Sequence, residues 1–231
     1  MLSNNDIKQI RSLSLKKFRQ ESGLFVVEGE KLVREAELSG FEVVRLLRVE
    51  DIGTEAMSRI TMLSSPSPAL AVVKQKVQPE PRYEGGLILA LDGLRDPGNV
   101  GTIIRLADWF GIRNIWASRD TVELYNPKVV QATMGAVFRV SVSYCDLPDV
   151  LTEAGCPVFG TFLGGENIYE ADLPSEGIIV MGSESDGISE EVGRVVSRRL
   201  TIPAFNAGER SCESLNVAIA TAITCSEFRR R

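Results

Sequence analysis

Histidine is absent from this sequence of 231 residues, and its absence restricts the chemistry that the protein can perform. Histidine is the most frequent general base and a frequent metal ligand, because its imidazole titrates near neutral pH. The four cysteines also form no C-x-x-C pair, so the sequence has neither a zinc knuckle nor a dithiol redox motif. We therefore expect no metal site, any catalysis to use other side chains, and reduced, mostly buried thiols at Cys145, Cys156, Cys212 and Cys225.

Long apolar runs are missing as well, since no stretch approaches the roughly 18 residues that span a bilayer. The first residues are polar and lack the basic and then apolar pattern of a secretory signal. The composition, 44% hydrophobic and 25% charged, is ordinary for a globular protein with one large or two modest domains. We therefore expect a cytoplasmic protein with no membrane partner.

Positive charge is not in excess, because the formal net charge is −5. Binding to an RNA backbone usually draws on clustered lysine and arginine, so this total argues mildly against an RNA partner. Basic residues are nevertheless grouped near both ends, at Arg229 to Arg231 and at Lys8, Arg11, Lys16, Lys17 and Arg19. Each group is explained about as well by a solubilising surface as by a binding site.

Proline, charge and glycine are concentrated over residues 78–86, which is the composition of an exposed linker. Before this linker the pattern predicts a small α/β domain over residues 1–77. Its expected strands cover Leu24 to Val27, Glu42 to Val49 and Ala69 to Val73, and a helix is expected over Glu30 to Leu38. A second domain is predicted over residues 87–231.

In the second domain, extended and helical segments alternate regularly, which predicts an α/β fold with a mainly parallel sheet. The expected strands cover residues 87–91, 114–117, 137–142, 158–162, 178–181 and 200–202. The expected helices cover residues 99–110, 127–134, 147–154, 189–196 and 214–229. Such sheets bind ligands beyond the carboxyl ends of their strands, so we expect a site in the loops after Leu91, Met181 and Ile202.

The first two of these loops combine glycine with polar residues. In the first, Asn99 is a favoured helix cap, and it shares a helix face with Arg105 only if it lies outside the first turn. In the second, Gly182 leaves room for a ligand against the backbone, and Glu184 can accept hydrogen bonds. Taken alone, each loop is also explained by a capped helix or a simple turn.

The third loop leads into the last expected helix. Ser214 is a good N-cap for that helix. Asn216 would then lie inside the first helical turn, where asparagine has a poor propensity and where its side chain could point at a ligand.

Together and in this order, the loops resemble the three motifs of the SpoU (TrmH-like) family of SPOUT RNA methyltransferases, which methylate ribose 2′-hydroxyl groups. The resemblance covers residues 87–231, and the segment from Glu28 to Glu35 resembles the family's N-terminal substrate-binding domain, similar to ribosomal protein L30e. The matching positions are Asn99, Gly101 and Arg105; Gly182, Glu184 and Gly187; and Ile202, Pro203, Ser214, Leu215, Asn216 and Val217.

The resemblance implies a deep trefoil knot in the C-terminal domain, an S-adenosylmethionine site in the knotted loops, and a homodimer. It also implies an RNA substrate, for which we favour ribosomal RNA over transfer RNA. By motif position the cofactor residues are Gly182, Ile202 and Leu215, together with Met181 and Thr161. Between Pro203 and Ser214 the chain is several residues longer than the family pattern.

The family places the catalytic role on Arg105, yet a guanidinium keeps its proton at any physiological pH. We therefore expect Arg105 to bind RNA phosphate and to stabilise the developing alkoxide. Its expected positioning residues are Asn99, Glu184, Ser214 and Asn216. A non-catalytic RNA-binding protein that keeps this fold is the alternative. Dinucleotide and triphosphate enzymes are disfavoured, because their glycine-rich phosphate loops are missing.

Overall fold

The structure, a computed structural model, describes residues 2–205 and 214–230 and divides into two compact units. The first unit combines Met1–Val77 with Glu123–Arg139, and the second combines Gln78–Val122 with Val140–Arg231. The segment Glu123–Arg139 therefore packs with the N-terminal residues although it follows the expected linker. The domain limits 1–77, 78–86 and 87–231 stay a prediction.

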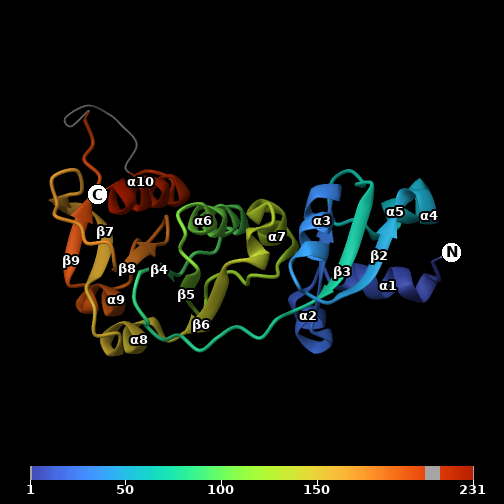
Figure 1. The fold of residues 1–231 in the computed structure, drawn as a ribbon, viewed down its shortest axis with the longest axis horizontal. Coiled ribbons are helices and arrows are strands. Elements are labelled where there is room, and N and C mark those ends of the chain that lie inside the picture. The colour runs from blue at the N-terminus through green and yellow to red at the C-terminus, as the bar shows by residue number, and fades with distance from the viewer. Residues whose placement is uncertain (1, 206–213, 231) are drawn as a thin grey trace. The chain divides into compact units, whose positions relative to one another are not determined.

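The first unit is built on a three-stranded antiparallel sheet in the order β1-β3-β2, of which β2 and β3 are labelled side by side in Figure 1. The three expected strands are confirmed as β1 (Leu24–Glu28), β2 (Val43–Arg48) and β3 (Ala69–Lys74). Its helices are α1 (Asn4–Ser12), α2 (Lys16–Ser22), α3 (Glu30–Leu38), α4 (Val49–Ile52), α5 (Thr54–Ile60) and α7 (Pro127–Thr133).

Aromatic packing explains why the segment Glu123–Arg139 belongs to the first unit. Phe25, on β1, is completely buried. Its ring centroid lies 4.5 Å from that of Tyr125 and 6.4 Å from that of Phe138. Aromatic side chains bury more apolar area than any others, so two of them are enough to attach a short segment to a core.

Arg19 shows that part of the N-terminal basic group is structural. Its side chain is 2% exposed, its Nε donates to Glu123 Oε1 at 2.7 Å, and its Nη1 donates to the Leu13 carbonyl oxygen at 2.6 Å. A charge can be buried only when it is paired and hydrogen-bonded, and both conditions are met here. Arg19 therefore contributes no charge to the surface.

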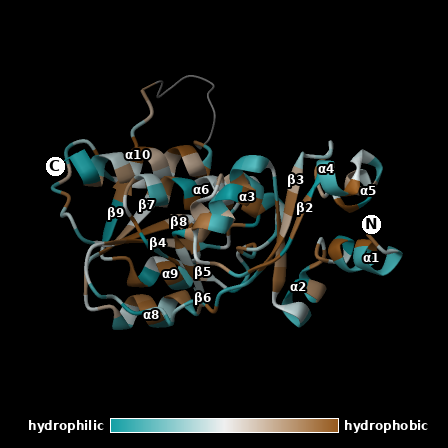
Figure 2. Ribbon diagram, turned by 45° about the vertical axis from the view of Figure 1, so that its right-hand side comes forward, coloured by the Kyte–Doolittle hydropathy of each residue, from teal (hydrophilic) through white to brown (hydrophobic). Residues whose placement is uncertain are grey.

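The second unit contains a six-stranded, entirely parallel sheet in the order β6-β5-β4-β8-β7-β9. The central strands β4 and β8 are the most hydrophobic part of this unit in Figure 2, which is typical of strands covered on both faces. The strands are β4 (Leu87–Asp92), β5 (Asn114–Ser118), β6 (Ser141–Cys145), β7 (Val158–Asn167), β8 (Gly177–Gly182) and β9 (Arg198–Thr201).

Two pairs of helices cover this sheet. In Figure 1 the pair α6 (Pro97–Trp109) and α10 (Val217–Arg230) lies over one face, and the pair α8 (Leu147–Glu153) and α9 (Glu190–Val195) lies over the other. Trp116, Ile178 and Val180 on the strands pack against residues of α8 and α9. The predicted α/β class with a mainly parallel sheet is confirmed, whereas the trefoil knot stays a prediction.

The expected strand over residues 137–142 is partly wrong. Strand β6 begins only at Ser141, and Ala136–Phe138 forms a 3₁₀ turn, η1. Before this turn the chain passes through the left-handed region at Met134, with φ 51°, and at Gly135, with φ 100°. The apolar run predicted burial correctly, but a reversal of the backbone at these two residues prevents an extended conformation over its first half.

No helix within the described residues is long and apolar enough to cross a bilayer. Cys145 and Cys225 are buried and unpaired, as expected, while Cys156 is half-buried. Burial raises the pKa of the Cys225 thiol to about 12 and that of Cys145 to about 11, so both are protonated at neutral pH. Cys212 lies outside the described residues.

Replacement of Glu123 by alanine should lower the free energy of unfolding by about 3 kcal/mol, because Arg19 would be left as an unpaired buried cation. Urea denaturation followed by circular dichroism measures this. Glu21→Ala is the control, because its ion pair with Lys17 is exposed and 3.9 Å long, so it should cost less than about 1 kcal/mol. Equal midpoints for both variants would contradict the structural role of Arg19.

Candidate active site

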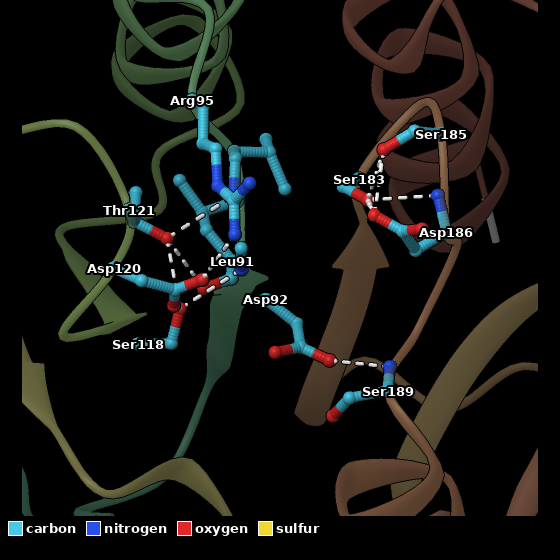
Figure 3. A network of polar contacts seen from close by, with 12 residues as sticks. Leu91, Asp92, Arg95, Ser118, Asp120, Thr121, Ser183, Ser185, Asp186 and Ser189 are labelled. Carbon is cyan, nitrogen blue, oxygen red and sulfur yellow. Dashed lines mark hydrogen bonds and ion pairs between the residues drawn. The ribbon is translucent and has the colours of Figure 1, made fainter.

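The expected site lies at the carboxyl edge of the parallel sheet. Strands β4 and β8 are neighbours and pair in register, with Asp92 opposite Gly182. The loops that follow these two strands therefore start side by side. This arrangement brings together segments that are far apart in the sequence, as Figure 3 shows for residues of the first and second loops.

The first loop ends in α6, which is capped by Asp96 and not by Asn99 as predicted. The backbone amide of Asn99 donates to Asp96 Oδ1 at 2.8 Å, and Pro97 occupies the first helical position. An aspartate cap followed by proline is a favoured start, because the carboxylate accepts a free amide and proline needs no acceptor. Asn99 therefore lies within the first turn, where its side chain is available for other partners. Arg105 follows six residues later, which places the two side chains about 120° apart around the helix.

The second loop folds tightly back on itself. The amides of Ser183 and Gly187 each donate to the other's carbonyl oxygen at 3.0 Å. A Cβ atom at Gly182 would lie only 2.1 Å from the carbonyl carbon of Gly187, so any other residue would displace backbone. The room left by the missing side chain is thus filled by the loop itself, and the contact of Gly182 with a cofactor stays a prediction.

The three loops meet in a triangle of side chains. Glu184 Oε1 accepts hydrogen bonds from Asn99 Nδ2 at 2.8 Å and from Asn216 Nδ2 at 2.9 Å. The remaining side is closed by Asn216 Nδ2, which also donates to Asn99 Oδ1 at 3.0 Å. Each of the three polar motifs supplies one member, and we call this set the amide–carboxylate triangle.

Asn216 has a second role, because it caps α10. Its Oδ1 accepts hydrogen bonds from the amides of Ala218 at 3.0 Å and Ile219 at 3.3 Å. The prediction that Ser214 caps this helix, with Asn216 inside the first turn, is therefore wrong. Asparagine is favoured at the N-cap, where its side-chain oxygen accepts hydrogen bonds from backbone amides. Its side-chain nitrogen stays free to donate to other residues.

The other two expected catalytic residues lie outside the triangle. Arg105 and Ser214 both have exposed side chains. In the part of the chain that the structure describes, no hydrogen bond or ion pair involves the side chain of either residue. Arg105 is thus a cation on the surface of α6 that has no partner among residues 2–205 and 214–230.

The expected cofactor residues lie on neighbouring segments of the same edge. Thr161 Oγ1 donates to the Val180 carbonyl oxygen at 3.3 Å and lies 3.6 Å from the sulfur of Met181. Met181 is buried, Ile202 is half-buried, and Leu215 is 49% exposed. The extra residues expected between Pro203 and Ser214 largely coincide with positions 206–213, which lie outside the described residues.

Asp92 is a residue of this edge that the sequence analysis missed. It is only 8% exposed, and its Oδ2 accepts a hydrogen bond of 2.7 Å from the Ser189 amide, as Figure 3 shows. The bond ties the end of β4 to the end of the second loop. A carboxylate placed directly after five buried strand residues was the available signal, because an acid so close to a core needs a partner.

A second group of polar contacts holds the first loop against the end of β5 (Figure 3). The Gly93 amide donates to Ser118 Oγ at 2.8 Å, and Ser118 Oγ donates to Asp120 Oδ1 at 2.7 Å. This hydrogen bond, with a further contribution from Arg95, lowers the pKa of Asp120 below its ordinary value. The loop that precedes α6 is therefore fixed from two sides.

A profile of the SpoU rRNA Methylase family matches residues 86–226, which is more than half of the chain. The chain belongs to this family. A second profile, that of the MRM3-like substrate binding domain, matches residues 4–80. The resemblance stated from the three motifs is thereby confirmed.

Several known proteins are similar to this chain over nearly its whole length. A TrmH-family protein from Porphyromonas gingivalis is 44% identical, with a TM-score of 0.88, over 100% of this chain and 99% of the other. An AdoMet-bound rRNA methyltransferase from Sinorhizobium meliloti is 32% identical, with a TM-score of 0.86, over 100% and 96%. The Bacillus subtilis 23S rRNA (guanosine(2553)-2'-O)-methyltransferase RlmP is 29% identical over 98% of this chain and 96% of its own.

Replacement of Asp92 by alanine should lower the free energy of unfolding by about 1–3 kcal/mol, because the half-buried backbone amide of Ser189 would lose its acceptor. Asp92→Asn keeps an acceptor oxygen and should retain most of that stability. Chemical denaturation measures both, and hydrogen exchange at the Ser189 amide should accelerate only in the alanine variant. Glu190→Ala, an exposed acid of α9, is the control. Equal losses for Asp92→Asn and Asp92→Ala would contradict the hydrogen bond.

Proposed function

We propose that the protein is an RNA methyltransferase that uses S-adenosylmethionine to methylate a ribose 2′-hydroxyl in ribosomal RNA. The observation that supports this most directly is the amide–carboxylate triangle, in which the three motifs of the family meet through Asn99, Glu184 and Asn216. The relatives agree in chemistry, since the Bacillus subtilis protein is named as a 23S rRNA methyltransferase and the Sinorhizobium meliloti structure contains AdoMet.

The residues at the carboxyl edge suit this cofactor. When bound, S-adenosylmethionine supplies a methyl group activated by a sulfonium. Its adenosine part needs apolar walls and backbone hydrogen bonds. Large apolar side chains are exposed at Leu163 in β7 (82%), at Phe205 after β9 (92%) and at Leu215 before α10 (49%). Exposed apolar side chains of this size are available to line a ligand site. We assign Gly182, Ile202, Leu215, Met181 and Thr161 to the cofactor side.

Arg105 fits the role of an electrostatic stabiliser. Methyl transfer forms a bond between the ribose oxygen and the methyl carbon, breaks the bond between that carbon and sulfur, and releases the hydroxyl proton. A guanidinium without an internal partner is able to bind a phosphate and to stabilise the oxygen as negative charge develops on it. The triangle acts as the positioning group that fixes the start of α6. Ser214, two residues before Asn216, is assigned to the same positioning group.

The target is ribosomal RNA, bound in part by the N-terminal residues. The match of residues 4–80 to a substrate-binding domain supports a separate RNA-recognition module. The likeness of this module to ribosomal protein L30e, the trefoil knot and the cytoplasmic location stay predictions of the sequence.

A homodimer formed through α6 and α10 is part of the proposal. Trp109, near the end of α6, is 84% exposed, and Ile219 on α10 is 54% exposed. The two helices are held together at their ends, where Arg229 Nε donates to the Phe110 carbonyl oxygen at 2.9 Å. A tryptophan this exposed is typical of a contact surface, because tryptophan is enriched at the buried centres of interfaces.

The function is tested with labelled cofactor and total RNA from cells that lack the gene. The wild-type protein should label ribosomal RNA at one ribose, found by mapping alkali-resistant positions. Arg105→Ala should lower the rate at saturating cofactor by at least about 100-fold, in the range of a lost charge-stabilising group. Its affinity for S-adenosylmethionine, measured by calorimetry, should change less than about 2-fold, since Arg105 is assigned to RNA and not to cofactor.

Arg113→Ala, which also removes an exposed arginine of the second unit, is the matched control and should leave the rate unchanged. A parallel loss of cofactor affinity and of rate in Arg105→Ala would contradict this division of roles. Cofactor binding without transfer to any RNA would favour the non-catalytic alternative.

Trp109→Ala should weaken the dimer, raising its dissociation constant by about 30-fold or more, as expected when the central anchor of an interface is truncated. Sedimentation equilibrium over a range of protein concentrations measures this constant. Leu38→Ala, which removes an apolar side chain of α3 that is 77% exposed, is the control and should have no effect. A monomeric wild-type protein, or equal effects of the two variants, would contradict the proposed interface.

A further inference from the structure

A groove of about 420 Å³ lies on the first unit, between α1, α2 and the sheet strands β2 and β3. It is separate from the triangle and uses no residue assigned to cofactor or catalysis. Its walls are mainly apolar, with Leu13 and Phe18 from the helical side and Val44 and Val72 from the sheet. A concave apolar surface of this size is large enough for one planar ring system.

Phe18 gives the groove an aromatic surface. Its side chain is 39% exposed, and every other aromatic residue in the described part of the first unit is less exposed. Val44, on the sheet wall of the groove, is exposed as well, at 51%. Water therefore contacts a cluster of apolar side chains, which is unfavourable unless a partner covers them.

The groove itself is lined by one acid, Glu21, and one cation, Arg45, and three lysines lie close to lining residues in the sequence. Lys8 precedes Gln9 on α1 and Lys16 begins α2, and no ion pair of either lysine occurs among the described residues. Lys17 has only the 3.9 Å contact with Glu21, and its Nζ lies 6.0 Å from the Phe18 ring centroid. Arg45, on the opposite wall, is neutralised by Asp6 at 2.7 Å. A negatively charged occupant is favoured over a neutral or basic one.

We propose that this groove binds an unpaired nucleotide of the RNA substrate, with the base stacked on Phe18 and the backbone phosphates near Lys8, Lys16 and Lys17. Exposed aromatic rings beside a positive surface are the usual elements of single-strand recognition, because every base has a face that can stack. The proposal rests on the proposed function and adds a second RNA contact, in the part of the chain that matches a substrate-binding domain.

The test uses the full chain and a fluorescently labelled uridine oligonucleotide of about ten residues, a length within the usual site size of single-strand binding proteins. Loss of one stacked base costs about 1–3 kcal/mol, so Phe18→Ala and Phe18→Leu should each weaken binding about tenfold. Phe18→Tyr keeps an aromatic face and should bind as the wild type does. The leucine variant preserves apolar volume, so it separates stacking from packing, and thermal unfolding checks that each variant is folded.

Charge is tested by the salt dependence of the same binding. Lys8→Gln combined with Lys16→Gln should reduce the slope of log K against log salt by about 1.4, because each phosphate contact contributes about 0.7 for a single strand. Arg194→Gln, an exposed cation of α9, is the control and should leave the slope unchanged. With ribosomal RNA as substrate, Phe18→Leu should raise KM while kcat and the affinity for S-adenosylmethionine stay constant.

Unchanged oligonucleotide binding by Phe18→Leu would overturn the proposal. An equal effect of Phe18→Leu on the binding of a duplex, which has no free base to stack, would also overturn it. A change in oligomeric state without a change in RNA binding would overturn it too, and would assign the groove to a protein partner. A wild-type protein that binds the oligonucleotide through Phe18 but methylates no RNA would support the groove and overturn the proposed function instead.

Discussion

The shared oxygen of Glu184 is the constraint on which the arrangement of the carboxyl edge depends. It accepts hydrogen bonds from one amide 85 residues earlier in the chain and from another 32 residues later. An ionised acceptor makes stronger hydrogen bonds than a neutral one, and two donors on one oxygen hold each other in place. Because Asn99 begins one helix and Asn216 caps another, the orientation of α6 and α10 at this edge is set by a single carboxylate.

The position of that carboxylate depends in turn on the loop behind it. Gly182 permits the backbone of Gly187 and Ile188 to approach so closely that no side chain fits, and Asp92 holds the far end of the loop through the Ser189 amide. These contacts lie at the edge of a sheet whose central strands are buried, except for the last residue of β8. The rigid strands thus support a tight loop, and this loop positions the exposed carboxylate of Glu184. Side chains held in this way by rigid elements are positioned more precisely than those on unsupported loops.

The strands and most helices were predictable because their apolar periodicity matches their burial. The starts of α6 and α10 were predicted wrongly. For α6 the pair Asp96-Pro97 was a local signal, whereas for α10 both Ser214 and Asn216 are good caps and nothing local distinguishes them. The attachment of residues 123–139 to the first unit was also beyond a sequence pattern, because it depends on Phe25 meeting Tyr125 in space. The triangle was predictable only as three separate motifs. The buried Arg19 looked like surface charge for the same reason, since its partner Glu123 is 104 residues away.

The dual use of Asn216 links the site to the order in which the chain is synthesised. Its oxygen caps α10 and its nitrogen closes the triangle, so neither can form before this residue and the turn after it have left the ribosome. A nascent chain that has folded the sheet up to β8 already holds Asn99 and Glu184, yet it lacks their common partner. Until Asn216 has emerged, the nascent chain therefore has no complete site, although ribosomal RNA, the substrate that we propose, forms part of the machine that is making it.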